Sequence, residues 1–269
     1  MTNRSPFIAL TIAGSDPSGG AGLQADLKTF HHHRVFGTSV VTLITAQNTH
    51  GVTAVQTLSP DLVQQQLEAV LSDMPPQACK TGALGSISVM NVVVTALKNA
   101  TFPRIFDPVM VSKHGHALIE EEAIDYFREQ LVPLADVLTP NRFELEKLAQ
   151  RSISTLDEAR AAAQILHSQG TKNILIKFGR HLGLNHLILS DGHQFEIIKQ
   201  PHLESRSLHG TGCVLSACIT ARLARGELLD AAVHSAIEDV HRAIRTAPAV
   251  GKSFLEKTGF GPINMNFDD

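Results

Sequence analysis

Short apolar runs alternate with segments of helical periodicity along the whole chain. The first run, residues 7–13, is continuously apolar and stops at a glycine-rich loop, as expected of a strand buried on both faces. A helix with apolar residues on one face is predicted to follow it over residues 23–33. Such alternation is typical of strands that pair in parallel through helical crossovers. The sequence therefore predicts an α/β fold with a mostly parallel, doubly wound sheet, built as one domain over residues 1–269.

The same alternation continues to the end of the chain. Further strands are predicted at residues 39–46, 52–58, 77–81, 103–106, 135–139, 173–178, 187–189 and 195–198, the last two as a hairpin. Further helices are predicted at residues 60–73, 86–99, 120–131, 143–150, 156–169, 212–225 and 228–246. Two of these helix starts carry a local signal, because Pro60 stands at a first helical position and Thr155 and Glu158 have capping-box spacing.

Polar side chains follow the predicted strands at the point where each strand ends. Asp16, Gln47, Asp107 and Asn141 stand at such points, and Lys177 lies near the end of another strand. Ligands of doubly wound sheets bind outside the carboxyl ends of the strands, where these side chains would gather. The sequence therefore predicts a binding site for a small molecule at this edge of the sheet.

The stretch Leu208-His209-Gly210-Thr211-Gly212-Cys213 precedes a long apolar helix. Its two glycines let the backbone turn sharply, and the helix start adds free N–H groups and the positive end of its dipole. An anion can be held at such a turn. Cys213 would lie in the first helical turn, where a thiol is more easily deprotonated. A plain glycine turn with a buried cysteine explains the same residues, and the stretch alone does not separate the two interpretations.

A second glycine-rich loop, residues 14–22, follows the first predicted strand. It lacks the lysine of a Walker A loop and the glycine order of a dinucleotide fingerprint, so on its own it indicates a strand-to-helix turn. Asp16 stands at the end of that strand, where its carboxylate can accept a hydrogen bond from a substrate. An aspartate that forms or caps a turn is the alternative.

Two carboxylates are candidates for holding Mg²⁺. Asp107 precedes a proline, which ends the strand there, and it can help to hold the ion or orient phosphate chemistry. Glu144 has capping-box spacing with Asn141, so both residues can simply cap a helix. The same Glu144 can reach a hydrated Mg²⁺ at the helix start, and the sequence leaves both roles open.

Composition limits the remaining classes of function. A net charge of −3 and 18% charged residues give no reason to expect nucleic acid or a membrane as partner. Three cysteines without metal-type or disulfide spacing suit the reducing cytoplasm, and the first apolar run is too short to span a bilayer. His31, His32 and His33 point in different directions on a helix, so a solvated helix end is expected there and not a metal site.

Several stretches, taken together, resemble the hydroxymethylpyrimidine/phosphomethylpyrimidine kinases of thiamine biosynthesis, in the ribokinase-like superfamily. Residues 13–30, which begin Ala13-Gly14-Ser15-Asp16, look like the N-terminal signature of that family. Stretches similar to other family motifs follow in the expected order at residues 45–49, 107–111, 139–141, 209–213 and 259–264. The resemblance covers nearly the whole chain. It implies a three-layer α/β sandwich, a homodimer, ATP with Mg²⁺ as phosphoryl donor, and an aminopyrimidine alcohol and then its monophosphate as acceptors.

The resemblance also implies roles for particular residues. Gln47 would hydrogen-bond the pyrimidine ring, and the acceptor site would further include Gly14, Asp16, Ala83 and Val109. The anion hole would be formed by Gly210, Thr211 and Gly212, with Cys213 as the base. Asn141 and Lys177 would bind ATP, and Asp107 and Glu144 would hold the metal ion.

Two other functions stay open at this point. A pyridoxal or pyridoxine kinase on the same scaffold is one, since both kinds of acceptor are flat heteroaromatic alcohols. A pyrimidine-binding regulatory protein without catalysis is the other. The chain departs from the family pattern at three residues: Ala83 stands where a methionine usually covers the substrate, Phe178 interrupts a glycine-rich stretch, and His116 replaces a common aspartate.

Overall fold

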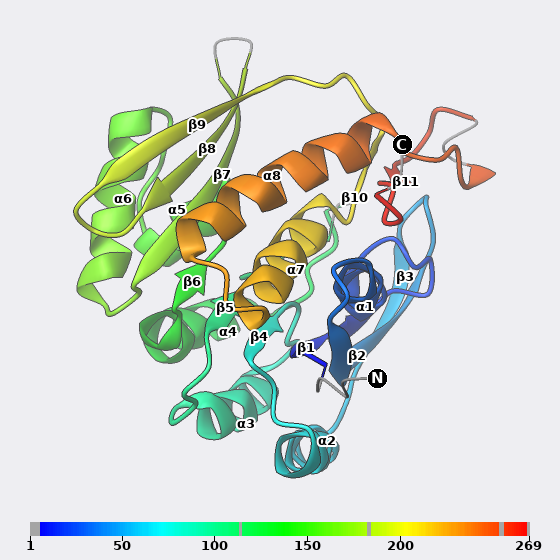
Figure 1. The fold of residues 1–269 in the computed structure, drawn as a ribbon, viewed down its shortest axis with the longest axis vertical. Coiled ribbons are helices and arrows are strands. Elements are labelled where there is room, and N and C mark those ends of the chain that lie inside the picture. The colour runs from blue at the N-terminus through cyan, green and yellow to red at the C-terminus, as the bar shows by residue number, and fades with distance from the viewer. Residues whose placement is uncertain (1–5, 113–114, 182–183, 253–255, 268–269) are drawn as a thin grey trace, which may run out of the picture.

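Nine strands form the central sheet of the computed structural model, which describes residues 6–112, 115–181, 184–252 and 256–267. The strands are β1 (Ile8–Ser15), β2 (Phe36–Gln47), β3 (Val52–Thr57), β4 (Ala78–Thr81), β5 (Arg104–Phe106), β6 (Val137–Leu138), β7 (Asn173–His181), β8 (Leu184–Ser190) and β9 (Phe195–Pro201). Their order is β3-β2-β1-β4-β5-β6-β7-β8-β9 (Figure 1). The neighbours from β2 to β7 pair in parallel, whereas β3, β8 and β9 join through antiparallel pairs. The mostly parallel sheet is confirmed.

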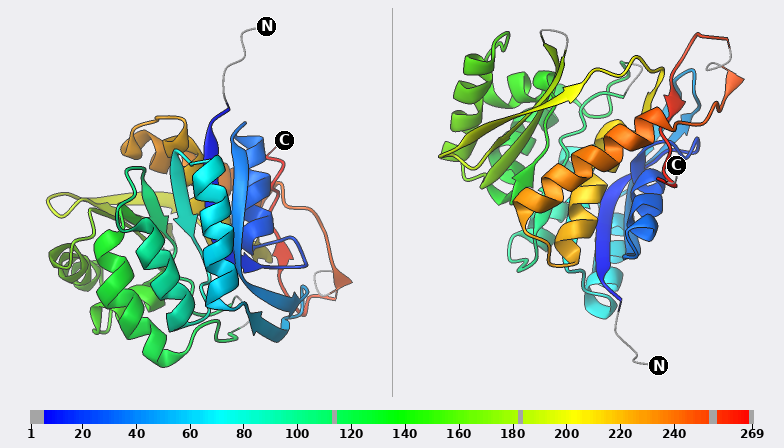
Figure 2. Two further views of the ribbon diagram at one scale, coloured as in Figure 1. Left: turned by 90° about the horizontal axis from the view of Figure 1, so that it is seen from below. Right: turned by 45° about the horizontal axis from the view of Figure 1, so that its top comes forward.

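Helices cover both faces of this sheet. One face carries α1 (Gly22–His32), α7 (Thr211–Ala224) and α8 (Leu229–Arg245). The other carries α2 (Pro60–Asp73), α3 (Ile87–Leu97), α4 (Glu121–Tyr126), α5 (Arg142–Ala149) and α6 (Leu156–Ser168), as Figures 1 and 2 show. Successive strand residues point to opposite faces, so Ile105 packs in the cluster under α7 whereas Phe106 packs under α2 to α6. The three-layer α/β sandwich is confirmed.

The middle helix of the first layer, α7, is buried on almost every side. All residues from Val214 to Ala221 are buried, because α1, α8 and the sheet surround them. A helix that is apolar all round is stable only in such a place. By contrast, α8 is amphipathic and keeps a polar face toward solvent. Within the described residues, we find no helix with the length and apolar content that crossing a bilayer would require.

The structure differs from the local expectations at three places. The helix expected over residues 120–131 is an α-helix only as far as Tyr126 and continues as a π-helical turn, Phe127–Leu131, whose two end residues are buried. The strand expected over 135–139 contains only Val137 and Leu138. A second, two-stranded sheet of β10 (Ser207–His209) and β11 (Gly261–Pro262) was not expected, because such short strands carry no periodic pattern.

The expected solvated end of the histidine run is correct for His31 and His32 but wrong for His33. His33 is buried at the end of α1, with its Nε2 3.4 Å from Cys218 Sγ and 3.7 Å from Asp239 Oδ2. Burial lowers the pKa of His33 to about 4, although Asp239 opposes this. His33 is therefore a neutral core residue that joins α1 to α7 and α8.

Candidate active site at the carboxyl edge of the sheet

The first turn of α7 lies at the edge where the parallel strands end. Gly210 precedes the helix with a φ of +83°, in the left-handed region that glycine adopts without strain. The first hydrogen bond of the helix runs from Val214 N to Gly210 O, 2.9 Å. The N–H groups of Thr211, Gly212 and Cys213 come before Val214 in the chain and so take no part in the helical hydrogen-bond pattern. The turn therefore offers donors to an anion.

The two glycine-rich loops of the chain pack directly on each other. A Cβ atom added to Gly210 would overlap the Gly20 carbonyl oxygen. A Cβ atom added to Gly20 would in turn lie 2.5 Å from Cδ2 of His209. Glycine is therefore required at residue 210 by the Gly20 backbone and at residue 20 by the buried His209 ring, and these contacts fix the start of α7 against the loop that follows β1.

On one side of the α7 turn, three polar side chains meet. His209 Nε2 lies 2.8 Å from Asp16 Oδ2 and 3.2 Å from Gln47 Nε2. His209 and Asp16 are buried, whereas Gln47, the last residue of β2, is half-buried. Asp16 also accepts hydrogen bonds from Ser18 and from Ala21 N within its own loop. The turn-forming alternative is thus realised for Asp16, and a contact of Asp16 with substrate stays a prediction.

On the other side of the turn, one lysine meets two carboxylates. Lys177 Nζ lies 2.8 Å from Asp107 Oδ1 and 3.9 Å from Glu144 Oε2. A Cβ atom on Gly212 would lie 3.2 Å from Lys177 Nζ, so this group faces the α7 turn. Burial opposes the charge of Lys177, but the two carboxylates raise its pKa above its usual value. Lys177 therefore presents a positive charge beside the first turn of α7.

The capping box predicted at residues 141 and 144 is present. Glu144 N donates to Asn141 Oδ1 at 2.9 Å, and Asn141 N donates to Glu144 Oε2 at 2.7 Å, at the start of α5. Burial raises the pKa of Glu144 to about 7, with Lys177 opposing the shift and Asp107 adding to it. The capping role is confirmed, and the role of Glu144 toward a metal stays a prediction.

The expectation of an easily deprotonated Cys213 thiol is wrong for the ligand-free protein. Cys213 does lie in the first turn of α7, but burial raises its pKa to about 11, against the effect of the Lys80 ammonium. Lys80 and Asp26 form a fully buried ion pair of 2.6 Å, and Lys80 Nζ also donates to Cys213 O at 3.3 Å. Desolvation of the thiol therefore outweighs the helix start.

The sequence interpretation predicted no role for three side chains in this region: His209, Lys80 and Asp26. Lys80 had a signal, because it is a charged residue inside the short strand β4, whose four residues are all buried. Its partner is 54 residues away in sequence, and His209 lies 193 residues from Asp16. Such distant pairs leave no local pattern.

The remaining predicted site residues also stand at the ends of parallel strands. Gly14 lies at an irregularity near the end of β1, and its neighbour Leu43 leaves no room for a side chain there. Ala83 follows β4, is 9% exposed, and accepts a 2.6 Å hydrogen bond from Thr42 Oγ1 through its carbonyl. Val109 follows β5, two residues after Asp107. Their contacts with an acceptor stay predictions.

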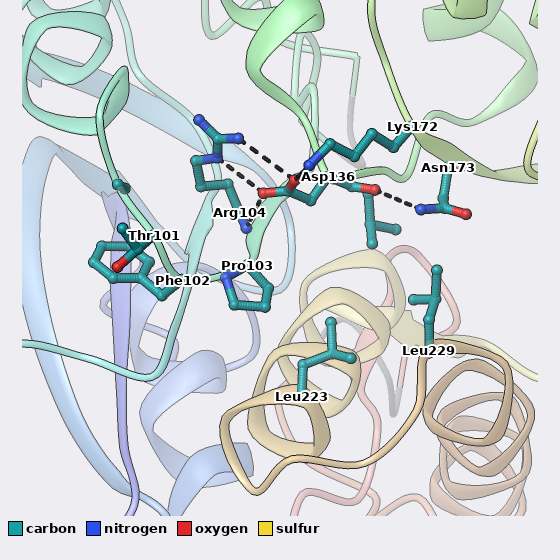
Figure 3. A pocket seen from close by; sticks show the side chains of 11 residues that line it. Thr101, Phe102, Pro103, Arg104, Asp136, Lys172, Asn173, Leu223 and Leu229 are labelled. Atoms are coloured by element: carbon teal, nitrogen blue, oxygen red, sulfur yellow. Dashed lines mark hydrogen bonds and ion pairs between the residues drawn. The ribbon is translucent and has the colours of Figure 1, made fainter.

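A cavity of about 340 Å³ lies at the opposite edge of the sheet, where β5, β6 and β7 begin (Figure 3). Its charged groups are paired with one another: Asp136 forms ion pairs with Arg104 Nε at 2.9 Å and with Lys172 Nζ at 2.7 Å. Leu223 and Leu229 form part of its apolar wall. This edge has no counterpart of the glycine turn among its described residues, so we place the candidate active site at the carboxyl edge.

The three-layer α/β fold, with a glycine turn at a helix start beside a lysine and two carboxylates, is that of the ribokinase-like proteins. The family model of phosphomethylpyrimidine kinase matches residues 16–258, and the chain belongs to this family. A hydroxymethylpyrimidine/phosphomethylpyrimidine kinase of Synechococcus elongatus is 46% identical over 258 residues, which are 95% of this chain and 96% of the relative.

Two solved structures extend this comparison. An ADP complex of Bacillus subtilis pyridoxal kinase superposes with a TM-score of 0.87 at 33% identity, covering 97% of this chain and 98% of that one. The phosphomethylpyrimidine kinase of Clostridium difficile superposes with a TM-score of 0.79 at 38% identity, covering 88% and 99% of the two chains. The ribokinase-like fold class expected from the sequence is confirmed.

Proposed function

We propose that this protein transfers a phosphoryl group from ATP to 4-amino-5-hydroxymethyl-2-methylpyrimidine, and then to the monophosphate, for thiamine biosynthesis. One observation carries the proposal: the α7 turn lies between an amide suited to a heteroaromatic ring, Gln47, and the charged group of Lys177, Asp107 and Glu144. A product assay by mass, with ATP, Mg²⁺ and the alcohol, should yield the mono- and then the diphosphorylated compound. A non-catalytic pyrimidine-binding protein would show binding without either product.

Phosphoryl transfer depends mainly on positioning and on neutralising charge. The N–H groups of Thr211, Gly212 and Cys213 would hold the oxygens of the transferred group, with the ammonium of Lys177 beside them. The donor set fits Mg²⁺, because Asp107 and Glu144 offer the carboxylate oxygens that the ion prefers. Bound there, the ion would add positive charge against the phosphate oxygens. Asn141, at the start of α5, would border the nucleotide.

A pyridoxal kinase is the second candidate function. It is favoured by the likeness to the pyridoxal kinase structure and by the small Ala83 at a position where the family resemblance implies a methionine. Because both acceptors carry a hydroxymethyl group on a flat ring, the phosphoryl-transfer machinery would be the same. The ratio of kcat/KM for the pyrimidine alcohol to that for pyridoxal separates the candidates, and a ratio below one would favour pyridoxal.

Gln47 is expected to determine acceptor affinity. Gln47→Ala should weaken binding of the pyrimidine alcohol by about 1–3 kcal/mol, because hydrogen bonds are lost or left unpaired, while the affinity for ATP stays unchanged. Titration calorimetry with each ligand measures both. Gln66→Ala is the matched control, since the Gln66 amide bonds only to backbone groups in the structure, those of Val41 and Leu62. An equal loss of affinity for both ligands in Gln47→Ala would make Gln47 a structural residue.

Cys213 is proposed to take the proton of the acceptor hydroxyl, which gives a defined pH dependence. With a thiol pKa of about 11, the thiolate fraction and kcat should rise about tenfold per pH unit from pH 7 to pH 9. Cys213→Ala should lack this rise and lose about 10²–10⁴-fold in kcat where the thiolate is populated. Cys213→Asp should give a flat profile over that range, because a carboxylate is already ionised.

The matched control for this experiment is Cys218→Ala, which removes a buried thiol from the same helix beside His33. It should keep the wild-type pH profile even where it lowers the melting temperature. If Cys213→Ala keeps the same rise of kcat with pH, Cys213 is not the base, and the backbone N–H groups alone remain as the catalytic elements of the turn.

A further inference from the structure

One ring nitrogen of His209 lies between two side chains of different hydrogen-bonding character. Nε2 of His209 is 2.8 Å from the carboxylate oxygen Oδ2 of Asp16 and 3.2 Å from the atom placed as Nε2 of Gln47. A ring nitrogen either carries a hydrogen and donates or offers a lone pair and accepts, but it cannot do both. The chemistry of Asp16 decides which state His209 adopts.

Asp16 can act only as an acceptor here. Its carboxylate receives hydrogen bonds from Ser18 N at 2.8 Å, from Ser18 Oγ at 2.9 Å and from Ala21 N at 2.9 Å. Burial would raise the pKa of Asp16, but the hydrogen bonds from His209 and Ser18 bring it below its usual value. An ionised Asp16 repels a lone pair, so Nε2 of His209 carries a hydrogen and donates it to Asp16. The His209 ring is held in place, because it is 4% exposed and packs against Gly20.

This state of His209 constrains the side-chain amide of Gln47. An amide NH₂ group cannot donate to a ring N–H, so the amide atom 3.2 Å from His209 Nε2 must be the oxygen. The oxygen and nitrogen of a glutamine amide are assigned from such partners and not from their positions. The amide therefore turns its oxygen toward His209.

The opposite end of the same amide gives an independent constraint. It lies 3.4 Å from Oγ1 of Thr45, whose hydroxyl hydrogen is given to the Ser15 carbonyl at 2.9 Å. Thr45 Oγ1 can therefore only accept there, so the group facing it must be the NH₂. His209 at one end and Thr45 at the other assign the same orientation to Gln47.

We propose that His209, held by Asp16, is a positioning residue that fixes the Gln47 amide in this orientation and thereby sets acceptor specificity. The proposal rests on the proposed function, in which Gln47 meets the acceptor ring. An aminopyrimidine edge has an amino donor next to a ring-nitrogen acceptor. It pairs with an amide in one orientation and loses both hydrogen bonds when the amide is reversed. An amide free to rotate would accept rings with either order of donor and acceptor.

Two variants of His209 test the proposal. His209→Leu removes the N–H, and it should raise KM for the pyrimidine alcohol about tenfold or more and lower the preference over pyridoxal by a similar factor. KM for ATP should stay within about twofold. His209→Gln keeps an N–H near the place of Nε2 and should restore most of the preference.

The matched control is His167→Leu. His167 is a partly buried histidine with two hydrogen-bonded ring nitrogens, to Thr171 O and Ser190 Oγ. It lies on α6, away from the carboxyl edge. Its replacement should lower stability and leave the acceptor preference unchanged. An unchanged preference in His209→Leu, or an equal loss with His209→Gln, would overturn the proposal.

A second measurement does not depend on turnover. Nitrogen-15 NMR of the His209 imidazole in the unaltered, ligand-free protein should show a hydrogen on Nε2, and in Asp16→Asn this signature should change. An unprotonated Nε2 in the unaltered protein would overturn the proposal. Failure of the unaltered protein to phosphorylate the pyrimidine alcohol would instead contradict the proposed function, and the NMR result would still decide the orientation of the Gln47 amide.

Discussion

Replacing Gly210 by alanine is expected to lower kcat by at least about 10³-fold. The added Cβ would overlap the carbonyl oxygen of Gly20, so the start of α7 and the loop after β1 would have to separate. Moving N–H donors away from the oxygens they stabilise costs about 10²–10³-fold for one donor, and Gly210 precedes a turn that carries three. Steady-state kinetics with ATP and the pyrimidine alcohol measures the loss.

Gly226→Ala separates this overlap from backbone strain. Gly226 has the same φ of +83°, but a Cβ atom there would have nothing within 4 Å. Both alanines thus incur the left-handed penalty of about 1–2 kcal/mol, and only Gly210→Ala adds the overlap. Thermal unfolding should show a loss of stability in both, with normal kcat in Gly226→Ala. Equal losses of kcat in the two variants would contradict the role given to the packing of the two loops.

Replacing Lys177 by methionine is expected to lower kcat by about 10²–10³-fold. The methionine keeps the length of the side chain but removes the charge that lies beside Gly212. It also leaves Asp107 and Glu144 without their shared cation, so the carboxylates would repel the phosphate. Lys177→Arg restores the charge and should recover part of the activity.

Lys172→Met is the matched control, because Lys172 forms a 2.7 Å ion pair with Asp136 at the opposite edge of the sheet. It should leave both kcat and KM unchanged. A Lys177→Met enzyme with normal kcat and a raised KM for ATP would mean that Lys177 binds the ground state and the transition state equally.

The sequence predicted which candidate side chains lie near one another, because the rule behind that prediction is geometric. In a parallel sheet, all strands end at one edge, so the residues after each strand are brought together whatever the details of packing. Asp107 follows β5 and Lys177 lies within β7, 70 residues further along the chain, and the two form an ion pair. The capping boxes at Asn141 and Thr155 were equally predictable, because each lies within four consecutive residues.

Properties that depend on the three-dimensional surroundings were not predictable from local patterns. Burial raises the pKa of Cys213 against the effect of Lys80, which comes from strand β4, 133 residues away in the sequence. His33 belongs to a run of three histidines, and only its packing against α7 and α8 separates it from its exposed neighbours. Short elements such as β10 and β11 form because their partners arrive from far along the chain.

The contact between Asp16 and His209 joins residues 193 positions apart, and this has a consequence for synthesis. While the ribosome makes the chain from its N-terminus, β1, its loop and Gln47 emerge long before the turn that must pack on them. The loop after β1 therefore lacks the contact of Asp16 with His209 until residue 209 has been translated. A nascent chain that ends before residue 210 lacks the turn that begins α7, so the candidate site can be completed only after more than three quarters of the chain has been made.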